Sequence, residues 1–248
     1  MQTAIVTGAS SGIGKAVAQR LLLDGWRVLG VGRDSAALET IGREAGPSFV
    51  PFQADVAADT APAEIVRAAM RDGHALNGLV QAAGVIASGA VDATTDEAWD
   101  AMFAVNVRAP FRLLREAAPH LERARGAVVN VSSVTGLRAF PGLASYCSSK
   151  AALDHLTRAA ALDFAPKGVR VNAVNPGVVV TNLHRRGGMD ETKYAAFLEH
   201  SKTTHPLGRA GQASEVADLI AFLLSEKAGW ITGETFAIDG GRHLTCAR

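Results

Sequence analysis

The chain has 248 residues, 48% of them hydrophobic and 20% charged, as in a globular domain with a large core. Lysine plus arginine (25) nearly balance aspartate plus glutamate (24), which gives no electrostatic reason to expect nucleic acid or a membrane as a partner. The two cysteines, Cys147 and Cys246, form no disulfide framework, and no apolar run approaches the ~18 residues of a membrane span. The first residues, MQTAIVTG, lack the order of a signal peptide, so we expect a cytoplasmic protein.

Short apolar runs rich in β-branched residues alternate with helix-like segments along the whole chain. Strands are expected at 3–7, 27–31, 48–53, 78–83, 127–132, 169–174 and 235–239. Helices are expected between them, at 13–24, 35–45, 61–72, 96–121, 146–165 and 214–225. The runs are apolar on both faces, as in strands of a parallel sheet covered by helices on both sides. The pattern predicts one doubly wound α/β domain over residues 1–248, with about seven parallel strands.

The first expected strand runs into a glycine turn, TGASSGIG at 7–14, and then into a helix. Gly8, Gly12 and Gly14 allow a tight turn and a close approach of a ligand to the backbone, and a helix N-terminus suits a phosphate. A P-loop does not fit, because residue 9 is alanine and Ala16 replaces the required hydroxyl residue. The turn therefore favours a dinucleotide cofactor.

The end of the second expected strand, GVGRD, bears on which dinucleotide binds. Dinucleotide sites place an acid here for the ribose hydroxyls, or an arginine where a 2′-phosphate is present. Gly32 stands at the acid's position and Arg33 follows it, which favours NADP(H). Asp34 would reach the ribose if the register differed by one residue, so NAD(H) stays possible. After the third strand, Asp55 either meets the adenine ring or is an acid at the N-terminus of a helix.

The hydroxyl groups of a tyrosine and two serines, together with the amine of a lysine, suggest acid–base chemistry. Tyr146 and Lys150 are four residues apart and lie on one face of the expected helix. Ser132 and Ser133 end an apolar strand, where ligands bind in open α/β sheets. Tyr146 and Lys150 are either surface residues or an acid and the charge that tunes it. A nearby ammonium is expected to lower the phenol pKa from its usual value of about 10.

About thirty residues without a strong helix follow Pro176 and Gly177, and excursions of this length are commonly functional or mobile. We expect a substrate lid at about 182–210, with a plain surface excursion as the alternative. Arg185 and Arg186 in this segment either meet an anionic substrate or are solvated charges.

The motifs together resemble the short-chain dehydrogenase/reductase family, and the resemblance extends from residue 3 to about 241. It rests on TGASSGIG (7–14), DV (55–56), AAG (82–84), Asn106, Ser133, Tyr146-x-x-x-Lys150 and PG (176–177). It implies a Rossmann-type fold with four catalytic residues: Tyr146 as the acid or base, Lys150 as its charge, Ser133 holding the substrate oxygen, and Asn106 holding a water near Lys150. No metal is implied. The implied cofactor-binding residues are Gly8, Ser10, Ser11, Gly12, Ile13, Gly14, Arg33, Asp55, Val56, Ala82, Ala83, Gly84, Tyr146, Lys150, Pro176, Gly177, Val179 and Thr181.

The resemblance implies an NAD(P)-dependent oxidoreductase that interconverts a ketone and a secondary alcohol, with NADP(H) favoured and with a homotetrameric assembly. One alternative is a 3-oxoacyl-thioester reductase acting on acyl carrier protein, which calls for a basic docking patch such as Arg108, Arg112 and Arg138. An alternative of another class is an inactive nucleotide-sensing protein. The family often carries Asn-Asn-Ala-Gly after its fourth strand, whereas this chain has Gln81-Ala82-Ala83-Gly84, which raises a question of stability.

Overall fold

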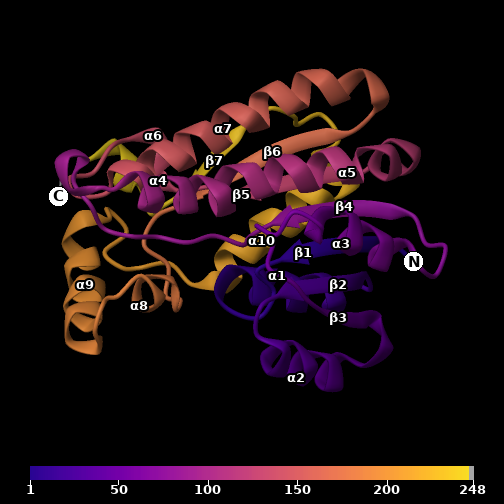
Figure 1. Cartoon of the computed structure of the whole chain (residues 1–248), viewed down its shortest axis with the longest axis horizontal. Helices are drawn as coiled ribbons and strands as arrows, with labels where there is room; N and C mark the ends of the chain where they lie inside the picture. The colour runs from indigo at the N-terminus through magenta and orange to yellow at the C-terminus, as the bar shows by residue number, and fades with distance from the viewer. Residues whose placement is uncertain (246–248) are drawn as a thin grey trace.

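A seven-stranded parallel sheet forms the centre of the computed structural model, which describes residues 1–245 (Figure 1). The strands are β1 (Thr3–Thr7), β2 (Arg27–Gly32), β3 (Phe49–Gln53), β4 (Leu76–Gln81), β5 (Ala127–Val131), β6 (Arg170–Pro176) and β7 (Thr235–Ile238). Their spatial order is β3-β2-β1-β4-β5-β6-β7, so the order reverses between β1 and β4. The predicted doubly wound fold is confirmed for these residues. Cys246 lies outside them.

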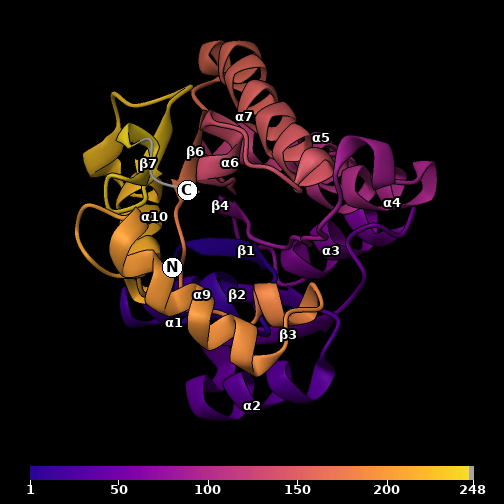
Figure 2. The ribbon, with the colours of Figure 1, turned by 90° about the vertical axis from the view of Figure 1, so that its left-hand side faces the viewer.

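Helices cover both faces of the sheet, as strands without a polar face require. One face packs against α1 (Gly12–Leu23), α2 (Ser35–Ala45) and α10 (Ala213–Leu224). The other packs against α3 (Ala61–Met70), α5 (Ala109–Ala124) and α7 (Ala144–Phe164). Alternate strand residues such as Ile5 and Val6 enter the two opposite cores, and both are fully buried. Figure 2 shows the two helical layers on either side of the strands.

The predicted continuous helix at 96–121 is wrong in one respect, because the chain forms two helices joined by a wider turn. α4 (Asp96–Phe103) passes into a π-helical segment (Ala104–Arg108) and then into α5. Pro110 lies in the first turn of α5, where its ring would collide with the carbonyl of Asn106 in a regular α-helix. The widened turn avoids that collision, and such π segments are frequent at functional sites.

The predicted excursion after β6 contains two helices, α8 (Leu183–Arg186) and α9 (Glu191–Thr204). They stand beyond the carboxyl ends of the strands, at the edge where the loops after β1, β4 and β5 also emerge (Figure 1). A short helix, α6 (Val134–Leu137), precedes α7 at the same edge. Short 3-10 turns lie at Gly46–Ser48, Val91–Ala93, Ala165–Lys167, Glu226–Ala228 and Arg242–Leu244. Across residues 1–245, no helix is long and apolar enough to cross a membrane.

Candidate active site

A cavity of about 1020 Å³ opens at the carboxyl ends of the strands, around the point where the strand order reverses. Open α/β sheets bind their ligands at this position. All eighteen residues predicted to bind the cofactor line the cavity, and Ser133 lines it as well. Asn106 is the one predicted site residue that does not. Residues far apart in the chain therefore meet in one space, as the hydrogen bond between Ser11 and Arg186, 175 positions apart, illustrates.

The glycine turn is built for close backbone contact. Gly8 has a φ of 70°, and a Cβ atom there would lie 2.8 Å from the carbonyl oxygen of Ala82. The backbone N–H groups of Gly12, Ile13 and Gly14 make no hydrogen bond to any described residue. They stand at the N-terminus of α1, where free donors and the helix dipole favour a phosphate. The turn thus fits the phosphates of a dinucleotide.

The residues after β2 bear on whether Arg33 meets the 2′-phosphate of NADP(H) or Asp34 meets the ribose of NAD(H). The Cβ atom of any side chain placed at Gly32 would lie 2.9 Å from Ser10 Oγ, so an acid there would require the Ser10 side chain to move. Arg33 lines the cavity, and its guanidinium makes no hydrogen bond or ion pair within residues 1–245. Asp34 instead precedes α2, where its Oδ1 accepts from the N–H of Ala37 at 3.0 Å. The carboxylate is engaged as a helix cap.

Asp55 lines the cavity beside Val56, and its Oδ1 accepts from the N–H of Ala57 at 3.0 Å. The alternative that it begins the next helix is wrong, because Thr60 is the residue that precedes α3.

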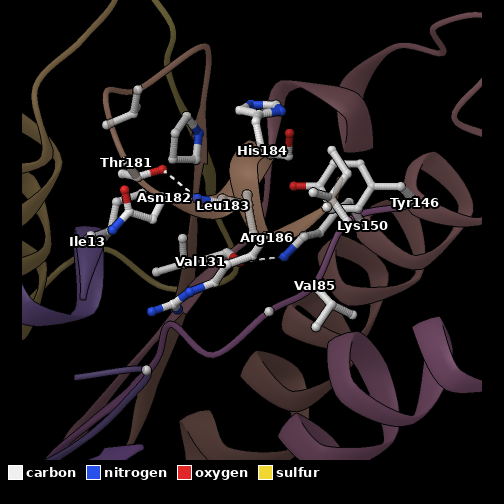
Figure 3. A pocket seen from close by; sticks show the side chains of 18 of the residues that line it. Ile13, Val85, Val131, Tyr146, Lys150, Thr181, Asn182, Leu183, His184 and Arg186 are labelled. Carbon is white, nitrogen blue, oxygen red and sulfur yellow. Dashed lines mark hydrogen bonds between the residues drawn. The ribbon is translucent and has the colours of Figure 1, made fainter. Parts of the chain in front are cut away.

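Tyr146 and Lys150 project from one face of α7 into the cavity, across from the segment Thr181–Arg186 (Figure 3). Lys150 Nζ lies 5.8 Å from the centre of the Tyr146 ring and donates to the carbonyl oxygen of Val131 at 2.9 Å. Ser133 caps α6 by accepting from the N–H of Thr135 at 3.1 Å. The reading of Tyr146 and Lys150 as surface residues is wrong, since both are about 5% exposed.

Burial decides the ionisation of these two groups. It raises the pKa of Tyr146 to about 12, although the hydrogen bond with the Ser133 side chain acts in the opposite direction. It lowers the pKa of Lys150 to about 8, although the Asp154 carboxyl opposes the change. The expected lowering of the phenol pKa is therefore not found. Desolvation of the phenolate outweighs the hydrogen bond with Ser133.

Asn106 holds the loop after β4. Its Oδ1 accepts from the N–H of Val85 at 3.0 Å, and its Nδ2 donates to the carbonyl of Val85 at 3.0 Å and to Ser149 Oγ at 3.1 Å. The side chain is buried in the π-helical segment. It therefore joins the loop after β4 to α7, on which Tyr146 and Lys150 stand. Its role toward a water remains a prediction.

Two buried side chains that sequence reasoning missed order the loop after β6. Tyr194 on α9 holds both backbone groups of Thr181, accepting from its N–H at 3.2 Å and donating to its carbonyl at 2.9 Å. His205 Nε2 accepts from the N–H of Val178 at 3.1 Å. Val179 between them makes no backbone hydrogen bond to a described residue, so its groups are available to a ligand.

The arginines considered for anion binding or docking have other partners. Arg185 pairs with both carboxylate oxygens of Glu191, while Arg186 donates to Ser11 Oγ in the glycine turn at 2.9 Å. Arg112 pairs with Asp59 at 2.6 Å, and Arg138 donates to the carbonyl oxygens of Arg242 and Thr245. Of the predicted docking patch, Arg108 alone makes no hydrogen bond or ion pair within residues 1–245, and the three arginines do not form one free basic patch.

The departure at Gln81-Ala82-Ala83-Gly84 is compensated locally. Gln81 Nε2 donates to Asn130 Oδ1 at 3.1 Å, which joins β4 to β5. Thr7 Oγ1 accepts from the N–H groups of both Ala82 and Ala83 at 3.1 Å. These bonds fix the end of β4 without an asparagine at position 82.

Comparison with known proteins agrees with this geometry. A family model described as enoyl-(acyl carrier protein) reductase matches residues 8–243. The chain is 37% identical to 2-(S)-hydroxypropyl-CoM dehydrogenase 3 of Xanthobacter autotrophicus, covering 95% of this chain and 94% of that protein. It is 36% identical to 3-oxoacyl-[acyl-carrier-protein] reductase FabG of Staphylococcus aureus, covering 98% of each. A solved short-chain dehydrogenase/reductase of unknown function from Caenorhabditis elegans, with cofactor, superposes with a TM-score of 0.92 at 31% identity, covering 98% of this chain and 96% of that one.

The chain belongs to the short-chain dehydrogenase/reductase family. It is an NAD(P)-dependent oxidoreductase acting on CH–OH groups.

Proposed function

We propose that the protein interconverts a ketone and a secondary alcohol with NADP(H), with Tyr146 exchanging the proton at the substrate oxygen. The observation that supports this most directly is the meeting of Tyr146, Lys150 and Ser133 in the cavity that also holds every predicted cofactor-binding residue. When bound, the nicotinamide would supply or accept the hydride.

The protein's own groups would handle the oxygen and its proton. In reduction, the Tyr146 phenol donates its proton to the carbonyl oxygen as negative charge develops there. Ser133 hydrogen-bonds the same oxygen and holds it beside the phenol. The Lys150 ammonium stabilises the phenolate that remains, and Asn106 supports this group by fixing α7 against the loop after β4. Oxidation runs through the same groups in reverse.

The preference for NADP(H) is supported by Arg33. Its guanidinium lines the cavity without a hydrogen-bond or ion-pair partner among residues 1–245, whereas Asp34 is engaged as the cap of α2. A guanidinium suits a 2′-phosphate because it forms paired hydrogen bonds with phosphate oxygens. NAD(H) is the alternative that the assay below distinguishes.

A second candidate, reduction of a 3-oxoacyl thioester on acyl carrier protein, is supported by the similarity to FabG. The partners found for Arg112 and Arg138 weaken it, because those two guanidiniums are not free to meet an acidic carrier. We retain it as an arm of the assay.

A lid and a homotetramer complete the proposal. α8 and α9 would form the lid at about 182–210, with Arg186 reaching the glycine turn. Large apolar side chains are exposed on the long helices α5 and α7, at Phe111 (45%) and Leu162 (78%), and before β7, at Trp230 (100%), and they support an assembly surface. Light scattering coupled to size exclusion measures the oligomeric state.

The function is tested by following oxidation of NADPH and of NADH with a panel of small ketones, sugars and 3-oxoacyl thioesters, both free and carrier-bound. Turnover of a ketone with NADPH favoured over NADH is the expected result. Turnover only with NADH contradicts the cofactor proposal, and turnover only with carrier-bound thioesters replaces the first candidate by the second.

A further inference from the structure

Part of the cavity is lined by residues that no predicted cofactor role uses. They come from the loop between α6 and α7, from the lid and from the turn after β7, namely Phe140, His184, Phe197 and Arg242. The rings of His184 and Phe197 are in contact, with centroids 4.6 Å apart. Figure 3 shows His184 on the Tyr146 side of the cavity, so His184 and the Phe197 ring in contact with it border the space where the substrate must lie.

Arg242 is a buried cation in this wall. It is 8% exposed, and its guanidinium carbon lies 5.0 Å from the centre of the Phe140 ring. One nitrogen, Nη1, donates to Thr204 Oγ1 at 2.8 Å. The other guanidinium donors have no partner within residues 1–245. Buried arginines are ordinarily paired, so this one has unused donors in the cavity wall.

No described carboxylate forms an ion pair or hydrogen bond with Arg242. The negative charge of Asp239 acts on Arg242 electrostatically, but the Asp239 oxygens accept from the N–H groups of Gly241 and His243, at 3.0 and 2.7 Å, and from the His243 ring at 2.9 Å. No ion pair within 4.0 Å joins it to Arg242. The carboxylate is therefore committed to the turn after β7.

A second guanidinium increases the positive charge of the same wall. Arg138 lies 5.3 Å from the centre of the same Phe140 ring, and its hydrogen bonds go to main-chain carbonyls, with no described carboxylate in contact. The ring face partly stabilises both cations. Burial lowers the pKa of His184 and of His205, and the positive charge of Arg242 acts in the same direction.

The other cations in the cavity wall have tasks elsewhere. Lys193 pairs with Asp190 at 3.2 Å, and Arg186 donates to the glycine turn. Arg33 stands at the ribose end, and Lys150 donates to Val131 beside Tyr146. Arg242 is left as the cation that faces the substrate space without an acidic partner among the described residues.

We propose that Arg242 binds an oxyanion of the substrate, a carboxylate or a sulfonate, and that the substrate is a ketone or secondary alcohol carrying such an acidic group. This inference rests on the proposed function. A guanidinium with free donors binds a carboxylate or sulfonate through paired charge-assisted hydrogen bonds, and the apolar wall of Phe140 and Phe197 suits the carbon chain between anion and carbonyl.

The test compares 4-oxopentanoate and 5-oxohexanoate with their methyl esters, which keep the ketone and remove the charge. The wild type is expected to have a kcat/KM at least about 10-fold higher for the acid than for its ester at one chain length. Arg242→Met should lower that ratio by about 10- to 100-fold, and Arg242→Lys should restore part of it. Arg123→Met, which removes an equal charge from the surface of α5, should keep the ratio.

A binding measurement makes the result independent of turnover. Calorimetric titration of the NADPH complex with hexanoate and with hexanamide should show saturable binding of the acid alone in the wild type, and its loss in Arg242→Met. Melting temperature and NADPH affinity report whether each variant is folded. If Arg242→Met does not fold, the proposal is tested by the acid-to-ester ratio of Arg242→Lys and by the wild-type titration with hexanoate and hexanamide.

The two proposals fail in different ways. If ketones react but acids are no better than esters, or if Arg242→Met changes both alike, the anion site is wrong and the oxidoreductase function stands. If no ketone reacts while hexanoate binding depends on Arg242, the anion site stands and the proposed reaction is wrong. Equal binding of hexanoate and hexanamide overturns the inference directly.

Discussion

Lys150 Nζ lies 5.8 Å from the centre of the Tyr146 ring, one helical turn along α7, and both side chains are buried. Burial favours the neutral form of each, so the phenol pKa rises to about 12 while the ammonium pKa falls to about 8. At neutral pH the phenol therefore keeps the proton that a reduction needs. The ammonium is the group of the pair that titrates within the working range.

Carbonyl reduction should decline as pH rises through about 8. Lys150 loses its proton there and no longer stabilises the Tyr146 phenolate, whereas the phenol itself stays protonated up to about 12. The pH dependence of kcat/KM for reduction measures this. Lys150→Arg, a permanently charged side chain, should remove the inflection even where it lowers the rate. A wild-type kcat/KM that stays constant between about pH 6.5 and 9.5 would contradict the role of Lys150 as the group that titrates.

Asp154→Asn should stabilise the fold at pH 7 by about 1 kcal/mol. Asp154 is buried, its Oδ2 accepts from Asn175 Nδ2 at 2.8 Å, and its Oδ1 has no partner within residues 1–245. Burial raises the pKa of this carboxyl, so the folded state binds its proton more tightly than the unfolded state does. That contribution is complete below the ordinary value of 3.8 and is lost as pH rises through the folded pKa.

The advantage of the asparagine should therefore shrink as pH falls from 7 toward 4. Melting temperatures of the two proteins across this range measure it. A variant that is less stable than the wild type at every pH would show that the carboxylate itself supports α7.

Gly8→Ala should destabilise the protein by about 1–3 kcal/mol and weaken NADPH binding strongly. The new Cβ would lie 2.8 Å from the Ala82 carbonyl oxygen at a φ of 70°. Gly25→Ala is the matched control, because Gly25 has a φ of 79° with nothing within 4 Å of the added atom. Denaturant unfolding and fluorescence titration with NADPH compare them. Equal effects of both substitutions would mean that backbone strain alone, and not the contact with β4, sets the requirement.

Arg33→Ala should reduce kcat/KM with NADPH by about 10- to 100-fold and leave the value with NADH within about threefold. The reason is the loss of a guanidinium that lines the cavity and has no partner in the described part of the chain. Asp34→Ala serves as the comparison. It should lower stability through the lost cap of α2 rather than change cofactor preference. A shift of preference toward NADPH in the Asp34 variant would show that Asp34 meets the ribose.

Sequence patterns predicted the strands and the convergence of the site well, because both follow from local rules. Runs apolar on both faces place strands in a covered parallel sheet, and glycines and hydroxyl residues at strand ends then share one edge. The break at Ala104–Arg108 was missed because apolar spacing continues across it, although Pro110 held the necessary signal.

Other features depend on contacts that no local pattern carries. Arg242 gains its significance from Phe140 and Thr204, which lie far from it in the chain. The direction in which the Tyr146 pKa shifts depends on how deeply the phenol is buried. The spacing of Tyr146 and Lys150 in the sequence does not indicate that burial.

The most direct test of the account is single-turnover reduction of a ketone by NADPH in Tyr146→Phe. The account predicts that the variant folds, binds NADPH with nearly wild-type affinity and reduces the ketone at least about 10²- to 10⁴-fold more slowly, because the proton donor is gone. A rate within a few fold of the wild type would contradict it, and would show that the proton comes from another group.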